Sequence, residues 1–516
     1  MKYVNELISG EYEHWKIGDI VFINSGTGTG KSHFIRNELS DYAMKESSLI
    51  LFIFNRSKLE EQNKNTLYDE FNFIVTTETY QGIEHEIINS GNYDFSKYKY
   101  IVCDEYHYFT EDSTFNDNSD ISLNSILNLK NHIRIFMSAT GHVLYNFFVQ
   151  EYEPKLKLNG NKIWTYTQKQ DYKNISSLFF YNDIEVVERF IQDKFPSEKD
   201  KILWFCGSVE QAAKLHSKHS NSSFMCSKDP KNRKYFNLLS HDSIISEDKN
   251  VTFKGKYLFT TKVLDNGFDL KDENIKLIVC DYFDLTTILQ CIGRKRMTSE
   301  HDKVHVVLKN YSNQSLAGFR TKLKQIIKEA DTLFSGGVDS WLKVVDRFGR
   351  KANYIIYDTV SDKGKFDSKK RISRPKYLKA KADLANLDKI INDNSDLNRF
   401  RELNGEKRVS DAFIQFIMSE LDKKSCYILD DIYGNQDLNG FLESIIGKVM
   451  LTTKDRTELI NKIDVRSDGH QLKGIESLNA ALKERGLNYQ IKEFETSRIE
   501  QGKKKKYKSA WKVVRI

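Results

Sequence analysis

A glycine-rich turn between a short apolar run and a helix-forming segment constrains this chain more than any other feature. Residues 21–23 predict a buried strand, and residues 33–39 have the composition of a helix. Between them, glycines let the backbone curl so that its N–H groups converge on one anion, and the helix start adds partial positive charge. A lysine and a serine closing such a turn can bind the β and γ phosphates and the Mg²⁺ ion of a nucleoside triphosphate. The predicted nucleotide-binding residues are Ser25, Gly26, Thr27, Gly28, Thr29, Gly30, Lys31 and Ser32, with Ser32 also a metal ligand.

Length and composition restrict the class of protein. A chain of 516 residues is too long for one hydrophobic core, and 39% hydrophobic with 29% charged residues is typical of a globular domain protein. A polar N-terminal segment predicts no secretory signal, and no apolar run is long enough to span a bilayer. The 6 cysteines are scattered, which favours reduced core residues over a zinc site. We expect a cytoplasmic protein, and the proline-poor, Lys-, Asn- and Ile-rich composition suggests a bacterial or phage genome.

The first third predicts a parallel sheet with helices on both faces, because strand and helix signals alternate from residue 21 to about residue 150. One apolar strand ends in Asp104 and Glu105. Beside a phosphate-binding loop, one carboxylate can belong to the Mg²⁺ shell while the other activates the attacking water. We therefore predict Asp104 as a metal ligand and Glu105 as the catalytic base, the alternative being a solvated acidic pair. The expected strands are residues 49–54, 73–77, 100–103 and 133–137.

The order of three short motifs extends this prediction. Gly-Lys-Ser at 30–32, Asp-Glu-Tyr-His at 104–107 and Ser-Ala-Thr at 138–140 follow one another, and this order resembles the superfamily 2 DExH-box helicases. The resemblance implies two RecA-like domains with ATP and nucleic acid bound across their cleft. It also implies that hydrolysis is coupled to domain movement through His107, Ser138 and Thr140.

The second third contains the motifs that this resemblance predicts. Residues 201–208 resemble the fourth motif, and residues 256–269 resemble the fifth, which closes on Gly267 and Asp269 as nucleotide-binding residues. Residues 290–296 resemble the sixth motif, Gln-x-x-Gly-Arg-x-x-Arg, but Met297 occupies the last position. A guanidinium from a second domain can stabilise charge on the transferring phosphoryl group. The resemblance implies catalytic roles for Lys31, Glu105, Gln290 and Arg294. For the second arginine two alternatives stay open: Arg296 replaces it, or the enzyme uses one arginine only. Strands are expected at 276–281 and 303–308.

The last third is less informative. From about residue 313 the pattern turns mostly helical. Residues 335–340 spell the Ser-Gly-Gly-Val-Asp-Ser loop of ATP-pyrophosphatases, but they follow a helical segment instead of a buried strand. We therefore predict a glycine turn at a helix end, with Asp339 or Ser340 capping the next helix. The basic stretch 363–381 predicts either a linker or a phosphate-contacting surface.

The end of the chain resembles a winged-helix unit. A helix is expected at 475–485, and strands at 487–491 and 510–514 flank a basic tip. Lysines beside an aromatic residue can hold a nucleic-acid backbone, although lysines at loop tips are often only solvated. The candidate nucleic-acid contacts are Asn55, Arg56, Thr79, Thr261, Lys503, Lys504, Lys505 and Lys506.

Together these patterns predict an α/β protein with two tandem RecA-like parallel-sheet domains and a mostly helical C-terminal region ending in a winged-helix-like unit. The expected parts are residues 1–170, 171–312, 313–420 and 421–516. We expect an ATP- and Mg²⁺-dependent helicase or translocase that acts on single-stranded or tailed duplex nucleic acid, DNA in preference to RNA. No membrane partner is expected, and the C-terminal third is available to protein partners. The alternatives are an ATPase switch that separates no strands, and an ATP-pyrophosphatase that depends on Asp339.

Overall fold

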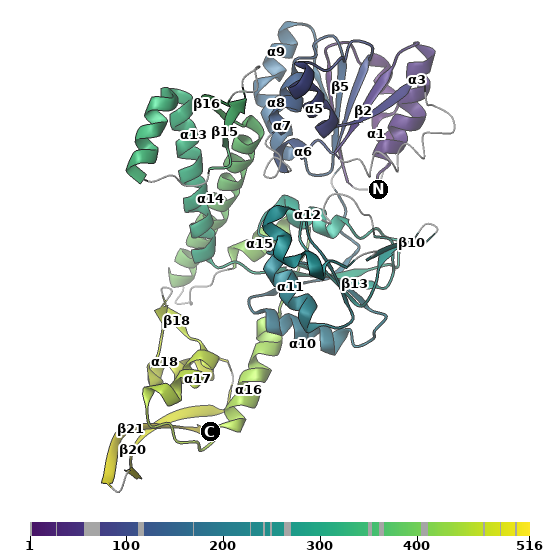
Figure 1. Ribbon diagram of the computed structural model, residues 1–516. Coiled ribbons are helices and arrows are strands. Elements are labelled where there is room, and N and C mark those ends of the chain that lie inside the picture. Colours follow the sequence, from purple (N-terminus) through teal and green to yellow (C-terminus); the bar gives the residue numbers. More distant parts are fainter. Residues whose placement is uncertain are drawn as a thin grey trace. The chain divides into compact units, whose positions relative to one another are not determined.

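The chain forms two compact units in the computed structural model (Figure 1). The first comprises Met1–Ser177, Glu198–Val306 and Tyr311–Lys424, and the second comprises Leu178–Ser197, Val307–Asn310 and Ser425–Ile516. The predicted four-part division of the chain stays a prediction. The structure describes residues 3–26, 28–55, 73–111, 118–168, 170–227, 229–240, 243–247, 250–262, 270–348, 353–360, 366–403, 411–467, 470–485, 487–500 and 503–516.

A six-stranded sheet in the order β3-β2-β4-β5-β1-β6 organises the first α/β domain, and every pair of neighbours in it is parallel. Its strands are β1 (Ile20–Ser25), β2 (Ile50–Phe54), β3 (Val75–Thr79), β4 (Tyr100–Asp104), β5 (Ile133–Ser138) and β6 (Ile163–Gln168). Its helical segments are α1 (Val4–Ile8), η1 (Glu11–His14), α2 (Lys31–Phe34), η2 (Ile35–Leu39), α3 (Ser40–Lys45), α5 (Tyr80–Ser90), α6 (Tyr108–Glu111), α7 (Ser119–Leu127), α8 (His142–Glu151) and α9 (Glu153–Leu158).

Both faces of this sheet are buried, as the continuous apolar strands predict. On β1, Phe22 packs into a core cluster with side chains of α5, α7 and α8, whereas Ile23 packs into a second cluster with side chains of α1, α2 and α3. Strand alternation thus places successive residues of β1 in two different cores. The strand expected at 73–77 is β3, which begins two residues later.

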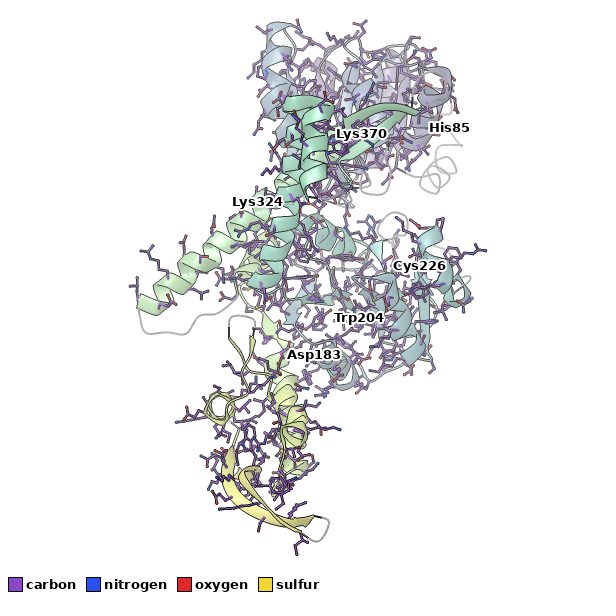
Figure 2. The ribbon with its side chains drawn as sticks, turned by 60° about the vertical axis from the view of Figure 1, so that its left-hand side comes forward. His85, Asp183, Trp204, Cys226, Lys324 and Lys370 are labelled. Carbon is purple, nitrogen blue, oxygen red and sulfur yellow. The ribbon has the colours of Figure 1, made fainter. Side chains whose placement is uncertain are left out.

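A seven-stranded sheet in the order β17-β7-β14-β13-β8-β12-β9 forms the second α/β domain. Its strands are β7 (Ile175–Tyr181), β8 (Lys201–Phe205), β9 (Ser222–Met225), β12 (Tyr257–Thr260), β13 (Ile275–Cys280), β14 (Val304–Lys309) and β17 (Tyr427–Ile428), beside the hairpin β10 (Ile244–Glu247) and β11 (Asn250–Phe253). Its helical segments are α10 (Ile184–Lys194), α11 (Val209–Lys218), η4 (Pro230–Leu238) and α12 (Leu285–Gly293). Trp204 of β8 is fully buried in this domain (Figure 2). The predicted class, two parallel-sheet α/β domains, is confirmed.

A helical region follows the second sheet, as expected. It consists of α13 (Asn313–Phe348), the hairpin β15 (Ile356–Val360) and β16 (Phe366–Ile372), α14 (Arg374–Leu403) and α15 (Ala412–Glu420). Residues 335–340 lie inside α13, which breaks at Gly337, where φ is 67° and ψ is −173°. The segment is entered directly from the helical residues of α13 and not from a buried strand, so the pyrophosphatase interpretation is wrong. The described residues of the basic stretch belong to β16 and the start of α14, and Figure 2 labels Lys370 among them. The described part of the stretch is therefore not a linker, and its prediction as a phosphate-contacting surface stays a prediction.

The C-terminal part has its own core, in which helices pack against a two-stranded antiparallel hairpin. Its elements are η6 (Asp430–Gly434), α16 (Asn435–Ser444), α17 (Thr453–Ile463), β18 (Arg466–Ser467), β19 (His470–Gln471), α18 (Ile475–Glu484), β20 (Tyr489–Glu500) and β21 (Lys503–Arg515). The predicted helix and hairpin are confirmed, but the strands are longer than expected. Pairing continues to Glu500 and Lys503, so the predicted tip lysines lie in a strand.

Among the residues that the structure describes, none of the helices combines the length and the apolar character needed to cross a membrane.

Candidate active site

The carboxyl ends of the parallel strands of the first sheet lie at one edge, and the predicted site residues follow them there. In the register, Asn24 of β1 is opposite Ser138 of β5, and Asp104 of β4 is opposite Met137. The strand order places β5 between β1 and β4. The Ser-Ala-Thr segment therefore emerges between the glycine-rich loop and the acidic pair.

The glycine-rich loop has the conformation that its sequence predicts. Gly28 and Gly30 have φ of 78° and 86°, which glycine adopts without the steric cost that a Cβ brings. Helix α2 begins directly after Gly30, at Lys31. On the outer side, the backbone N–H of Val4 in α1 donates to the carbonyl of Thr29 at 3.0 Å, so the start of the chain supports the loop.

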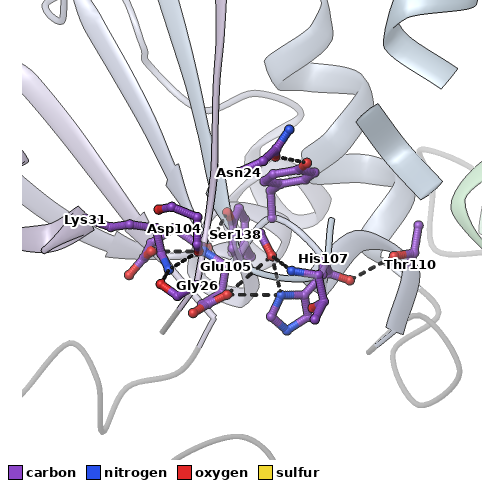
Figure 3. A network of polar contacts seen from close by, with 12 residues as sticks. Asn24, Gly26, Lys31, Asp104, Glu105, His107, Thr110 and Ser138 are labelled. Atoms are coloured by element: carbon purple, nitrogen blue, oxygen red, sulfur yellow. Dashed lines mark hydrogen bonds and ion pairs between the residues drawn. The ribbon is translucent and has the colours of Figure 1, made fainter. Parts of the chain in front are cut away.

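Lys31 lies at the centre of the loop. Its Nζ donates to the carbonyls of Ser25 at 2.9 Å and Gly26 at 3.0 Å, and Figure 3 shows it directed at Gly26. The Thr29 hydroxyl donates to the Gly26 carbonyl at 2.8 Å and lies 2.9 Å from the Ser25 hydroxyl. The side chains of the loop therefore hold it curled, with the ammonium group where a bound phosphate would be reached.

The backbone makes a sharp turn at the acidic pair. Glu105 has φ of 47°, a left-handed conformation that costs a non-glycine residue about 1–2 kcal/mol. Two hydrogen bonds support the turn: the Glu105 N–H donates to Asp104 Oδ1 at 3.1 Å, and the buried Tyr80 hydroxyl donates to the Asp104 carbonyl at 2.9 Å. The turn directs the two carboxylates differently, although they are neighbours in sequence.

His107 and Ser138 lie beside Glu105 (Figure 3), and Thr140 joins them in one network of polar contacts. Nδ1 of His107 lies 3.1 Å from Glu105 Oε2 and 2.9 Å from the Ser138 hydroxyl. The Ser138 hydroxyl is 3.4 Å from the same Glu105 oxygen and accepts the Thr140 N–H at 3.1 Å. The structure thus brings together the three residues predicted to couple hydrolysis to movement, and it places them against the predicted base.

The two carboxyl groups have different electrostatic environments. Burial, followed by the charge of Glu105, raises the pKa of Asp104 to about 7. Burial also acts to raise the pKa of Glu105, but the hydrogen bond from His107 and the charges of Lys31, His107 and Arg294 outweigh it, and the net pKa is lowered. Glu105 is therefore the ionised member of the pair at neutral pH, as a base must be, and a cation beside Asp104 would favour its ionised form.

A cavity of about 870 Å³ joins residues of the two α/β domains. From the first domain it is lined by Lys31, Ser32, Asp104 and Glu105, and from the second by Arg296. Neither Gln290 nor Arg294 is among its described lining residues, although the charge of Arg294 reaches Glu105. The other lining residues are Gly28, Gly30, His33, Arg36, Gln170, Asp171, Asn174, Lys271, Ile292, Gly293, Lys295 and Met297.

The arginine segment after α12 is fixed by its neighbours. Leu270 and this segment exchange backbone hydrogen bonds: the Leu270 N–H donates to Arg294 and the Arg296 N–H donates to Leu270, both at 2.8 Å. Between the two arginines, Lys295 forms a 2.6 Å ion pair with Asp302, and both side chains are 0% exposed. The segment thus has a rigid base from which Arg296 reaches the cavity, while Met297 occupies the position at which the resemblance expects the second arginine.

Ser32 and Asp104 fit the Mg²⁺ prediction by donor chemistry. A hydroxyl and a carboxylate oxygen line the same cavity, and Mg²⁺ is typically bound by one or two protein oxygens with the substrate phosphates supplying further ligands.

Sequence reasoning missed Arg36, which lines the same cavity. Burial lowers its pKa, and the charge of Asp104 opposes that shift. A signal existed: Arg36 follows Ser32 by four residues in a segment predicted to be helical, and residues four apart share a helix face. Lys295 lies within the predicted sixth motif, whereas Lys271 carried no comparable signal, since only the fold brings it to the cavity.

The predicted nucleic-acid contacts are dispersed. Asn55 is buried and directly follows β2. Thr79 is the last residue of β3 and is opposite Phe54 of β2. The Thr79 hydroxyl caps α5 by accepting the Gly82 N–H at 2.9 Å. Thr261 is buried after β12. Lys505 and Lys506 are exposed on β21, in the second unit. Outside the described residues lie Thr27, Arg56, Gly267 and Asp269, together with the side chains of Lys503 and Lys504.

Comparisons with known proteins find solved structures that are similar to this chain at low sequence identity. No protein-family model matches the chain, and no curated protein matches it. A solved structure of S. cerevisiae Dbp5 bound to RNA and ADP BeF3 is similar with a TM-score of 0.39 and 15% identity, covering 67% of this chain and 96% of that chain. The DUF1998 helicase MrfA bound to DNA and AMPPNP is similar with a TM-score of 0.39 and 14% identity, covering 67% of this chain and 58% of that one. At these TM-scores the likeness carries no argument about the function of this chain.

Proposed function

We propose that this protein is an ATP-dependent nucleic-acid helicase or translocase of superfamily 2. The observation that supports this most is the convergence of three groups on one cavity: the loop lysine and serine, the acidic pair, and Arg296 from the other α/β domain. Phosphoryl transfer depends on positioning and on electrostatic stabilisation, and each group supplies one of these. A site divided between two domains can also couple hydrolysis to their movement.

The chemistry assigns one task to each group. Lys31 and the loop N–H groups bind the β and γ phosphates of ATP. Glu105, ionised and held by His107 and Ser138, accepts a proton from the water that attacks the γ phosphate. Arg294 and Arg296 stabilise charge on the transferring phosphoryl group, and Gln290 orients the water or the γ phosphate. Mg²⁺, when held by Asp104 and Ser32, supplies charge neutralisation at the phosphates.

Coupling follows from the network around Glu105. Ser138 contacts both the base and His107, and its hydroxyl also accepts the N–H of Thr140. A change at the γ phosphate that moves Glu105 therefore displaces the start of the segment after β5. We propose that this segment transmits ATP state to the nucleic-acid strand, which is gripped through its phosphates by Asn55, Arg56, Thr79, Thr261 and the β21 lysines.

Steady-state ATP hydrolysis tests the proposal. Wild-type protein and Glu105→Gln are assayed without polymer and with single-stranded DNA, RNA or duplex, and Glu86→Gln, an exposed change on α5, is the matched control. We expect one polymer, DNA before RNA, to stimulate the wild type and the control. Loss of the base should lower kcat by about 100-fold or more. Hydrolysis that no polymer changes would contradict the motor.

A regulated ATPase switch is the second candidate, favoured by one observation: Met297, and not an arginine, lines the cavity beside Arg296. A switch hydrolyses ATP on its polymer or protein partner but separates no strands. Release of a labelled strand from a tailed duplex distinguishes the two functions, because only a helicase releases the strand during hydrolysis.

A further inference from the structure

A buried lysine in the helical region holds three carboxylates. Lys379 of α14 has a side chain that is 7% exposed, and its Nζ lies 2.7 Å from Asp284, 2.5 Å from Asp383 and 3.5 Å from Glu111. Buried charges persist when they are paired and hydrogen-bonded. Burial raises the pKa of Glu111 to about 7 and that of Asp383 to about 6, whereas the pKa of Asp284 is lowered, against the effect of burial, by Lys379 and Lys262. The Lys379–Asp284 pair is thus the ionised centre of the cluster.

Asp284 connects this cluster to the helix that carries the arginine segment. It is the N-cap of α12: its Oδ2 accepts the N–H of Thr287 at 3.0 Å and the hydroxyl of Thr287 at 2.6 Å. Its other oxygen, Oδ1, accepts Lys379 at 2.7 Å. One oxygen therefore caps the start of the helix and the other attaches it to α14. Nine residues later α12 ends at Gly293, directly before Arg294.

Glu111 connects the cluster to the acidic pair. It is the last residue of α6, which begins immediately after the Asp-Glu-Tyr-His motif. The Glu111 N–H donates to the carbonyl of His107 at 2.8 Å, and the Thr110 hydroxyl donates to the same carbonyl at 3.0 Å. Lys379 therefore touches the segment that follows the base and the helix that leads to the arginines.

Helix α14 is attached to the first α/β domain independently of Asp284. The Arg374 guanidinium lies 4.4 Å from the centre of the Phe147 ring on α8, and Leu378 packs against the core of the first sheet. The preceding hairpin adds a hydrogen bond from the Tyr357 hydroxyl to Asp120 of α7. Lys379 thus projects from a helix whose position the first domain already determines.

We propose that Lys379 is a positioning residue for the arginine segment: through Asp284 it holds α12 so that Arg294 and Arg296 face the nucleotide bound by the first domain. The proposal rests on the proposed function, because it concerns the same cavity. The proposal gives α14, which belongs to the helical region and to neither α/β domain, a part in hydrolysis. The link between Lys379 and Asp284 does not include the loop that binds ATP. Breaking this link should therefore lower kcat and leave the KM for ATP nearly unchanged.

The test measures kcat and KM for ATP in the full chain with single-stranded DNA. Asp284→Asn keeps an oxygen for the cap and removes the charge that Lys379 holds. Lys379→Met removes the other partner, and the double variant combines both. Asp383→Asn is the matched control, because it takes a carboxylate from the same lysine but within α14.

We expect Asp284→Asn and Lys379→Met each to lower kcat by about 10- to 100-fold, as for a displaced catalytic group. The double variant should be no worse than the worse single variant, since both break one link. Asp383→Asn should keep nearly the wild-type kcat. A wild-type kcat in Asp284→Asn, losses that multiply in the double variant, or an equal loss in Asp383→Asn would overturn the proposal.

A thermal-unfolding cycle separates this proposal from the proposed function. It compares the wild type, Asp284→Asn, Lys379→Met and the double variant. If the wild type hydrolyses no ATP with any polymer, the proposed function fails, while non-additive unfolding midpoints for Lys379 and Asp284 would still support the link. Additive midpoints would overturn the link. If Lys379→Met does not fold because it leaves three carboxylates together, Asp284→Asn and Asp383→Asn still decide the kcat comparison.

Discussion

At the scale of single residues, the site depends on a strained turn that few hydrogen bonds support. Glu105 adopts φ of 47°, and the carbonyl before it accepts the Tyr80 hydroxyl at 2.9 Å. Tyr80 is fully buried and stacks on Tyr108 with ring centres 4.5 Å apart. Strained residues persist where the surrounding structure holds them, so Tyr80 is a positioning residue for the base.

Removing one hydroxyl tests this role. We expect Tyr80→Phe to lower stability by about 1–3 kcal/mol, since it leaves the Asp104 carbonyl buried without its donor. It should also lower kcat for ATP several-fold, because the Glu105 turn loosens. Tyr108→Phe is the control: its hydroxyl donates to Glu84 at 3.0 Å and not to the acidic pair. Chemical denaturation and steady-state kinetics provide both readouts, and an equal fall in kcat in the two variants would contradict the role.

At the scale of elements, continuous apolar runs made β1, β2, β4 and β5 predictable, because strands buried on both faces need no alternation. The loop and the acidic pair were predictable for a related reason: their residues are contiguous and follow those strands. β16 was not, since a segment with Lys369, Lys370 and Arg371 has the composition of a solvated linker. Lys379 was not predictable either, because its partners Glu111 and Asp284 are far away in sequence and only packing joins them.

The C-terminal hairpin illustrates how pairing changes the interpretation of a basic run. Since β21 includes the lysines, successive side chains point to opposite faces. Lys506 forms a 2.6 Å ion pair with Glu495 across the hairpin, whereas Lys505 shares a face with Tyr507 and its ammonium lies 5.1 Å from that ring centre. The face with Lys505 combines a cation and an aromatic ring, a combination that suits binding of single-stranded nucleic acid.

This difference predicts unequal effects of two neighbouring lysines. Lys505→Ala should weaken binding of single-stranded DNA several-fold and reduce the salt slope by about 0.7, the value for one lost phosphate contact. Lys506→Ala removes the same charge one residue away, but from the face of β21 that lacks Tyr507, where Lys506 pairs with Glu495, so it should change affinity less. Fluorescence anisotropy titrations over a series of salt concentrations measure both. Equal losses would show that only net charge matters.

At the scale of the whole molecule, the second unit is discontinuous in sequence. Its part from Ser425 onward meets Leu178–Ser197 through several contacts. Strand β17 pairs with β7, and the Tyr427 ring lies 5.3 Å from that of Phe179. Asp430 accepts the backbone N–H groups of Asn182 at 2.7 Å and Asp183 at 3.1 Å. A short segment after residue 424 thus completes an edge of the second sheet, whereas the helices and hairpin that follow have their own core.

Two truncations only ten residues apart should therefore behave differently. A chain ending at Gly434 keeps β17, Asp430 and the Tyr433 hydroxyl, which donates to Asp193 at 2.7 Å, and it should fold and hydrolyse ATP without polymer like the full chain. Without the hairpin it should require more polymer for stimulation.

A chain ending at Lys424 uncovers Phe179 and Phe190 and leaves two backbone N–H groups without their carboxylate, so its thermal midpoint should fall by several degrees. Equal midpoints for the two truncations would show that β17 and Asp430 contribute nothing to the sheet. If polymer stimulates ATP hydrolysis equally in the chain ending at Gly434 and in the full chain, the nucleic-acid site lies entirely in the residues that the truncated chain keeps.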